Sequence, residues 1–258
     1  MSGAVHPTAI VSADAEIAPD AGIGPYAVVG EKVILGAGTK VSAHAVIENW
    51  TTVGEGCTIG PGAVIGGAPQ SLGDQGHRSS VRIGKRTVVR EYATVNRSKE
   101  ANGETLVGDD CYLMAYSHVG HDCVLENRVV VVNAANLGGH LLVEEGAFIS
   151  ALVPVHQFVR IGRLSLIGTL SPVRKDILPY TIVEGHPPRV RGLNVEGLRR
   201  QKAPPQVRKT LKNVLKLLLK EEASTEQAVR RIREDHGDVP EAVHLADFIE
   251  KSKRGFYR

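Results

Sequence analysis

The sequence predicts a parallel β-helix of short strands, followed by an α-helical C-terminal region. Three observations predict this fold class. From residue 5 to residue 173, every sixth residue is Val, Ile or Leu at 26 of 29 positions. The residue two places before each of these is usually small, as at Ala21, Ala27 and Ala45. After Val173 this period stops and helical patterns begin. A strand and a turn in every hexapeptide is typical of a β-helix.

The composition excludes several classes of protein. Of the 258 residues, 42% are hydrophobic but only 4% are aromatic, which favours a narrow core of Val, Ile, Leu and Ala. The formal charge of +3 does not indicate a nucleic-acid partner. No basic segment precedes an apolar run at the start, and no apolar run is long enough to cross a bilayer, so we expect neither a signal peptide nor a membrane span. Three scattered cysteines predict a reduced, cytoplasmic protein.

Residues 1–176 form the predicted β-helix. Side chains alternate along a strand, so the small residue and the aliphatic residue two places later share the inward face. Cys57, Cys111 and Cys123 all occupy the small position and are expected to be core fillers. Glycine often follows the aliphatic residue, and we expect it there because turns need backbone angles that glycine tolerates.

Two polar, turn-rich segments interrupt the period, near residues 67–80 and 96–106. Each is either a solvated loop or, as is common for insertions in repeat proteins, part of a binding face.

The C-terminal region is predicted in two parts. Residues 177–192 form a proline-rich connection, and residues 193–258 form a helical domain. Helices are expected over 195–201 after an Asn194 cap, over 206–222, from Ser224 to Gly237, and from Pro240 onward. Lys and Arg exceed Asp and Glu by five from residue 193 on, which fits ordinary helix surfaces or a patch for an acidic protein partner.

The repeat resembles that of the hexapeptide acyltransferase superfamily. Members of this superfamily form a left-handed prism with three hexapeptides in each coil. The resemblance therefore implies a left-handed parallel β-helix in which the chain returns to the same corner after every third hexapeptide.

A coil of three hexapeptides brings four histidines to one edge of the prism. His121 would lie beneath Gly139, and His118, His140 and His156 would crowd the same edge on neighbouring coils. Histidine is suited to act as a general base near neutral pH. It is also a good zinc ligand, and gamma-class carbonic anhydrases bind zinc on the same kind of repeat. The spacing alone leaves both interpretations open.

Four motifs resemble the signature of the UDP-N-acetylglucosamine O-acyltransferases, which start lipid A synthesis. These motifs are HVGHDC at 118–123, GGH at 138–140, VHQF at 155–158 and LNVEGLRR at 193–200. The resemblance implies transfer of an (R)-3-hydroxyacyl chain from acyl carrier protein to the 3-hydroxyl of UDP-N-acetylglucosamine. It also implies a homotrimer without cofactor or metal.

The resemblance assigns roles to particular residues. His121 would be the general base, Asp122 would orient it, and the Gly139 N–H would stabilise the oxyanion. The residues expected to bind substrate are His118, His140, His156, Gln157, Asn194, Glu196, Arg200, Gln70, Ser71 and Asn96.

The resemblance also implies a ruler for acyl-chain length at Thr169, with Leu166 beside it. Glycine at this position leaves a long channel, so Thr169 predicts a preference for shorter or intermediate chains. We expect Thr169 to lie two coils after His121 on the strand ladder.

The chain departs from the family pattern at three polar positions. Ser71 and Gly73 replace an acid and a lysine, and Asn96 replaces a histidine. Either neighbours such as Asp74 or His77 compensate, or the accepted sugar differs. The alternatives to the leading interpretation are a paralogue that acylates another nucleotide sugar or an amino-sugar, a zinc hydratase, and a scaffold without activity.

Overall fold

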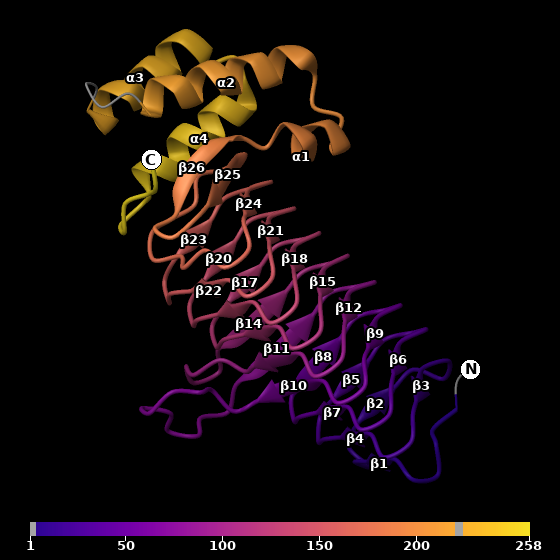
Figure 1. Cartoon of the computed structure of the whole chain (residues 1–258). Helices are drawn as coiled ribbons and strands as arrows, with labels where there is room; N and C mark the ends of the chain where they lie inside the picture. Colours follow the sequence, from indigo (N-terminus) through magenta and orange to yellow (C-terminus); the bar gives the residue numbers. More distant parts are fainter. Residues whose placement is uncertain (1–3, 220–223) are drawn as a thin grey trace.

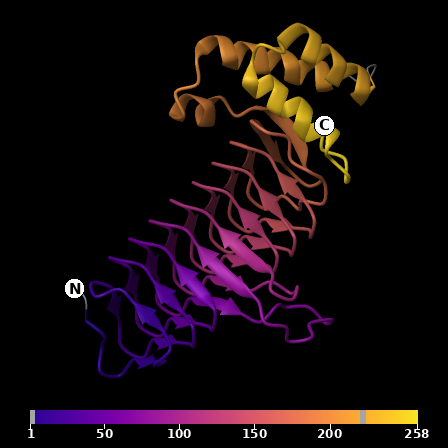
Figure 2. The same cartoon turned by 180° about the vertical axis from the view of Figure 1, so that it is seen from behind.

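The computed structural model describes residues 4–219 and 224–258. In these residues a long three-sided prism of strands carries a group of helices across its C-terminal end, while the N-terminus lies at the far end (Figures 1 and 2). This arrangement confirms a parallel β-helix followed by a helical region.

The prism has three faces, each a sheet of parallel strands stacked along its axis. The first sheet contains β1 (Ile10–Val11), β4 (Val28–Val29), β7 (Val46–Ile47), β10 (Val64–Gly67), β13 (Thr94–Asn96), β16 (His118–Val119), β19 (Asn136–Leu137) and β22 (Pro154–Val155). The second sheet contains β2 (Glu16–Ile17), β5 (Ile34–Leu35), β8 (Thr51–Val53), β11 (Ser80–Ile83), β14 (Glu104–Val107), β17 (Val124–Leu125), β20 (Leu142–Val143) and β23 (Arg160–Ile161).

The third sheet contains β3 (Gly22–Ile23), β6 (Lys40–Val41), β9 (Thr58–Ile59), β12 (Val88–Val89), β15 (Tyr112–Leu113), β18 (Val130–Val131), β21 (Phe148–Ile149), β24 (Leu166–Ile167), β25 (Thr181–Glu184) and β26 (Arg189–Leu193). β25 continues the stack in parallel, and β26 returns antiparallel to it. The segment expected to be a connection therefore contains two strands that close the end of this sheet.

The register confirms coils of three hexapeptides. Val28 pairs with Val46, and His118 pairs with Asn136. The two insertions lengthen their coils by whole hexapeptides. Val64 pairs with Thr94, two hexapeptides more than one coil, and Thr94 pairs with His118, one hexapeptide more. The aliphatic period therefore stays in frame on both sides of the insertions.

The core is the narrow interior of the prism. The aliphatic series from Ile23 onward is almost completely buried, and so are the small residues two places earlier. Such short strands leave little width between the three faces, which is why small side chains alternate with branched ones there.

The glycines that follow the aliphatic residues are needed for a different reason from the one expected. At Gly120 a Cβ atom would lie 2.8 Å from the Gly138 carbonyl carbon of the next coil, and Gly138 has the same conflict with Gln157 N. The left-handed backbone occurs two residues later, at Asp122 (φ 61°) and His140 (φ 58°). At these two coils the left-handed turn position is therefore filled by non-glycine residues, while the glycine two places earlier permits close stacking. Glycine fills the turn position in other coils, as at Gly62 (φ 65°), and Gly66 follows Ile65 and is itself left-handed.

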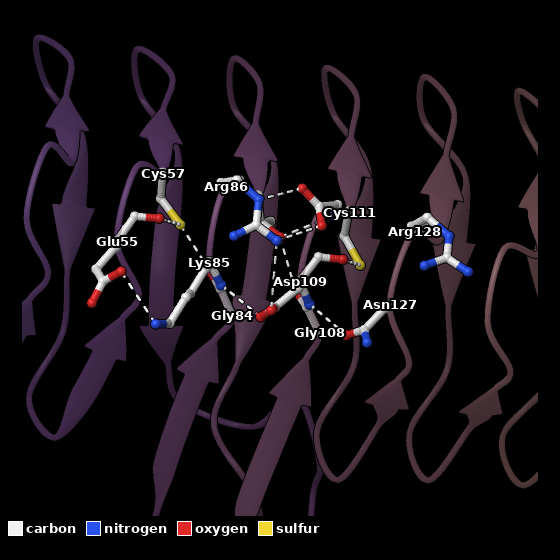
Figure 3. A network of polar contacts seen from close by, with 12 residues as sticks. Glu55, Cys57, Gly84, Lys85, Arg86, Gly108, Asp109, Cys111, Asn127 and Arg128 are labelled. Carbon is white, nitrogen blue, oxygen red and sulfur yellow. Dashed lines mark hydrogen bonds and ion pairs between the residues drawn. The ribbon is translucent and has the colours of Figure 1, made fainter.

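The three cysteines are buried core fillers, as predicted. Cys57 Sγ donates to Gly84 O at 2.9 Å and Cys111 Sγ donates to Glu126 O at 3.2 Å, beneath a ladder of exposed charges (Figure 3). In that ladder Lys85 pairs with Glu55 at 3.2 Å. Such exposed pairs contribute little to stability.

We expect the thiols to resist alkylation in the folded protein. Burial raises the pKa of Cys111 to about 11 and that of Cys123 to about 12, and it also raises the pKa of Cys57. Because the thiolate is the reactive form, iodoacetamide at pH 8 should label none of the three. The same reagent added after denaturation should label all three cysteines, as counted by mass spectrometry. Labelling of the native protein at stoichiometric levels would contradict the packing.

The helical region consists of α1 (Val195–Arg200), α2 (Pro205–Leu219), α3 (Thr225–His236) and α4 (Pro240–Glu250) among the described residues. Asn194 and Ser224 cap α1 and α3 with side-chain hydrogen bonds, as predicted. The last residues of the helix expected over 206–222 lie outside the described part. The predicted division of the chain into domains stays a prediction.

The helices are fixed to the end of the β-helix by polar contacts around Glu144. His244 Nε2 on α4 lies 2.9 Å from Glu144 Oε2, which also accepts a hydrogen bond from the Arg163 N–H at 2.8 Å. Arg160 donates to Phe248 O at 3.0 Å and lies over the Phe248 ring. These contacts give α4, and the helices packed on it, a defined place on the prism.

Candidate active site

The predicted histidine edge is the corner of the prism between the first and second sheets. His121, His140 and Phe158 follow β16, β19 and β22 in successive coils. The His140 ring stacks on Phe158, with ring centroids 4.6 Å apart, and meets the His121 ring edge-on at 5.1 Å. The coil repeat therefore builds a column of rings along this corner.

His121 and Asp122 form a hydrogen-bonded pair within this column. His121 Nδ1 lies 2.7 Å from Asp122 Oδ2, and each side chain is only 12% exposed. With Nδ1 donating to the carboxylate, Nε2 is left as the basic nitrogen. The geometry matches a base held in one orientation by a carboxylate.

Gly139 makes room for the His121 ring. A Cβ atom at Gly139 would lie 2.7 Å from both Cε1 and Nε2 of His121. The basic nitrogen therefore lies against the backbone of the coil above. Within residues 4–219 and 224–258, no acceptor takes the Gly139 N–H.

Asp122 is held by four groups besides His121. It accepts hydrogen bonds from the Ser98 hydroxyl and, at 3.1 Å, from the Lys99 N–H, while its own N–H donates to Thr105 Oγ1 at 2.8 Å. His140 Nε2 lies 3.7 Å from Asp122 Oδ2. Burial acts to raise the pKa of Asp122, but the hydrogen bonds from Ser98, His121 and Lys99 outweigh it, and the pKa lies below its ordinary value. The carboxylate is therefore ionised at neutral pH.

His118 lies on β16 beside this pair. Its Nδ1 is hydrogen-bonded to the Thr94 hydroxyl at 2.8 Å. Burial, and to a smaller extent the nearby His121, lowers the pKa of His118. His118 is consequently neutral near pH 7 and can donate or accept a hydrogen bond.

His156 and Gln157 are exposed one coil above Gly139, on the same corner. The C-terminal segment reaches this place as well, because Arg254 Nη2 lies 3.3 Å from His156 Nδ1. A guanidinium from the end of the chain thus joins the predicted site residues.

The two insertions belong to the same corner, since they connect β10 to β11 and β13 to β14. Asn96 is buried and ties them together, with Nδ2 donating to Ala68 O at 2.7 Å. Gln70 is exposed and Ser71 is partly buried in the first insertion. A Cβ atom on Gly73 would lie 3.4 Å from Lys99 Nζ, so a lysine ammonium from the second insertion lies beside this departure from the family pattern.

Asn194, Glu196 and Arg200 lie at another corner, between the second and third sheets. Asn194 caps α1 through Gly197 N and donates to Leu164 O at 2.8 Å, and Leu164 follows β23. Glu196 and Arg200 form an exposed pair at 3.2 Å. One chain therefore does not bring these residues to the histidine corner.

Thr169 does not lie above His121, contrary to the expectation. It follows β24 and is exposed at the third corner, between the third and first sheets, while Leu166 lies on β24 itself. The path from His121 to Thr169 is two full coils and two further hexapeptides, so it ends two corners farther around the prism.

Sequence reasoning missed five neighbours of the site: Ser98, Lys99, Thr105, Phe158 and Arg254. Only Phe158 had a signal, because it follows His140 by one coil. Ser98 and Lys99 lie in an insertion, where no period predicts the path of the chain.

Among the described residues, His121, Asp122 and His140 also form a group whose side chains are of the types that bind metal ions. One donor atom of each lies within 4.8 Å of the others. The donor set is one that zinc accepts. The same Asp122 oxygens, however, already receive the hydrogen bonds from Ser98, Lys99 and His121.

Comparisons with known proteins show which family the chain is similar to. Residues 176–257 match the family described as Udp N-acetylglucosamine O-acyltransferase, domain 2, and residues 32–67 match the bacterial transferase hexapeptide repeats. A curated acyl-[acyl-carrier-protein]–UDP-N-acetylglucosamine O-acyltransferase of Alkalilimnicola ehrlichii is 40% identical over 194 residues, which is 75% of each chain. Its counterpart in Synechocystis is 41% identical over 71% of this chain and 66% of its own length.

Solved structures match over nearly the whole chain. The UDP-N-acetylglucosamine acyltransferase of Francisella novicida superposes with a TM-score of 0.95 at 33% identity, covering 99% of this chain and 94% of that one. The enzyme of Bacteroides fragilis gives the same TM-score at 34% identity, covering 98% and 99%. The match confirms the left-handed form of the β-helix, and the chain belongs to the UDP-N-acetylglucosamine O-acyltransferase family.

Proposed function

We propose that the chain transfers an (R)-3-hydroxyacyl group from acyl carrier protein to the 3-hydroxyl of UDP-N-acetylglucosamine, the first step of lipid A biosynthesis. The observation that carries the proposal is the His121–Asp122 pair, whose basic nitrogen lies against the backbone of Gly139. The names of the relatives at about 40% identity supply the donor and the acceptor.

In this mechanism His121 Nε2 removes the proton of the sugar hydroxyl while Asp122 stabilises the resulting imidazolium. The hydroxyl oxygen attacks the thioester carbon, and the Gly139 N–H donates to the oxyanion. The carbon–sulfur bond then breaks, and the imidazolium returns its proton to the leaving thiolate. No residue becomes acylated, so the transfer takes place in one ternary complex.

We place the nucleotide site between subunits of a homotrimer. In a three-fold ring the histidine corner of each prism can lie against the third sheet of its neighbour. That sheet runs from the corner of Glu196 and Arg200 to the corner of Thr169, so both can meet the histidine corner of the next subunit. A column of exposed apolar residues at the third corner also needs a cover: Tyr26, Tyr92, Tyr116, Leu152 and Leu170.

None of the helices in the described residues has the length and apolarity that a membrane crossing requires. The cytoplasmic location that we propose is supported by three buried, unpaired cysteines.

The activity is tested by mass spectrometry of reactions that combine several UDP-sugars with acyl carrier protein loaded with 3-hydroxyacyl chains of graded length. We expect an O-acyl product from UDP-N-acetylglucosamine. Product from another nucleotide sugar or an amino-sugar alone would support the paralogue, and no product from any pair would reject an acyltransferase. The same reactions test whether His121, Asp122 and His140 hold a metal. Turnover that disappears after dialysis against EDTA and returns with zinc would contradict the metal-free mechanism.

Thr169→Gly should shift the preferred acyl chain to a greater length. Thr169 lies beside Leu170 in the exposed apolar column, which in a trimer faces a neighbour. Removing its methyl and hydroxyl groups leaves space for further carbons, and each buried methylene is worth about 0.8 kcal/mol. Competition between acyl carrier proteins of different chain length measures the shift. An identical chain-length profile in both proteins would remove the ruler role.

A further inference from the structure

A contact between the second insertion and the His121–Asp122 pair points beyond the residues known from the family motifs. Ser98 is 1% exposed, and its hydroxyl donates to Asp122 Oδ1. Oδ2 of the same carboxylate receives the His121 ring and the Lys99 N–H. The second insertion therefore supplies a donor to each oxygen of Asp122, and His121 shares only Oδ2.

The insertion is shaped to hold the Ser98 hydroxyl in place. The Glu100 N–H donates to Ser98 Oγ at 3.0 Å, and the Ser79 hydroxyl donates to Ser98 O from the first insertion. A Cβ atom on Gly103 would collide with Ser98 Oγ, so only glycine leaves space for it. With the Glu100 N–H donating to its oxygen, the Ser98 hydroxyl hydrogen is free to point at the carboxylate.

Asp122 needs such support because its backbone is in the left-handed region, at φ 61°. That conformation is unfavourable for a residue with a side chain. Its side chain must also point back along the corner toward the preceding residue, His121. A carboxylate without the Ser98 donor can rotate about its terminal bond, and the His121 ring would lose its fixed orientation.

We propose that Ser98 is a positioning residue for the reaction, which fixes the Asp122 carboxylate and through it the orientation of the general base His121. The inference rests on the proposed function, because a positioning role presupposes a reaction in which His121 is the base. It assigns no substrate contact to Ser98. It makes the second insertion part of the catalytic machinery.

Ser98→Ala should lower kcat about tenfold, the effect of losing one hydrogen bond to a charged group. KM for both substrates should stay within about twofold, because Ser98 touches neither. The acid limb of the pH–rate profile should move to higher pH. The hydrogen bond from Ser98 is one of the causes that lower the pKa of Asp122, so a carboxylate that loses this donor binds its proton more tightly.

Two comparisons decide between positioning and general loss of structure. Ser165→Ala removes a hydroxyl that is also buried, between β23 and β24, and should leave kcat and the pH profile unchanged. In an Asp122→Ala background, Ser98→Ala should cause no further loss, because its effect passes through that carboxylate. An equal loss in both backgrounds, or a rise in KM at constant kcat, would overturn the proposal.

A measurement without substrate separates this proposal from the proposed function. In protein with ¹³C-labelled aspartate, the Asp122 carboxyl titration followed by NMR should have a higher midpoint in Ser98→Ala than in the wild type. This result is expected whatever the enzyme acylates. An unchanged midpoint would reject the role of Ser98 even if the transferase activity is found.

Discussion

His121→Ala should nearly abolish acyl transfer while leaving the protein folded and assembled. Removal of a general base costs a factor of about 10² to 10⁴ in kcat. The side chain lies at a corner of the prism, outside the aliphatic core, so little packing is lost with it. The kcat of the variant, measured with saturating acyl carrier protein and UDP-sugar, gives the size of the effect.

His6→Ala is the matched control, because His6 is an exposed histidine at the far end of the β-helix. Its activity should equal that of the wild type. Circular dichroism and sedimentation should be the same for all three proteins. Activity of His121→Ala within a few-fold of the wild type would show that another residue is the base.

Gly139→Ala should lower kcat by a factor of about 10² or more, although it adds a single methyl group. The added Cβ would lie 2.7 Å from His121 Cε1 and Nε2, far inside van der Waals contact. The backbone of this coil is fixed, because the His140 N–H donates to His121 O and the Phe158 N–H donates to Gly139 O. The His121 ring must therefore move, and a base displaced by about 1 Å loses its alignment with the hydroxyl.

The double variant shows whether the methyl group acts through His121. In a His121→Ala background the ring is gone, so Gly139→Ala should cost much less than it does alone. Any remaining loss measures damage to the oxyanion site at the Gly139 N–H. Full additivity of the two losses would mean that the methyl group acts on the coil rather than on the base.

The period of six predicted the β-helix, and the family resemblance supplied the coil of three hexapeptides that brings the histidines to one corner. Hydrogen bonds between coils confirm this repeat, which stacks His121, Gly139 and Gln157. The expectation for Thr169 was wrong because its separation from His121 along the chain is two coils and two further hexapeptides, not a whole number of coils.

The rest of the site depends on contacts that have no period. Ser98 reaches Asp122 from an insertion whose path is set by local hydrogen bonds, such as that of Asn96 with Ala68. Arg254 reaches His156 from a distant segment of the chain, at its C-terminal end. The reason for the glycine series was also hidden, since close stacking of backbones is visible only when two coils are placed together.

Mixed trimers test most directly the central claim, that a catalytic corner of one subunit meets the nucleotide-binding residues of the next. Arg200→Ala should raise KM for the UDP-sugar about tenfold or more, since it removes a charged hydrogen bond to substrate. His121→Ala lacks the base. In trimers assembled at random from equal amounts of the two variants, about a quarter of the interfaces should combine an intact His121 corner with an intact Arg200.

Sedimentation should first show a species of about three times 27.6 kDa. The two variants are then unfolded together, refolded, and assayed at a UDP-sugar concentration well below KM. The account predicts that the mixture is clearly more active than the average of the two separate proteins. A mixture with only that average activity, from trimers shown to contain both chains, would place the complete site within one subunit and contradict the account.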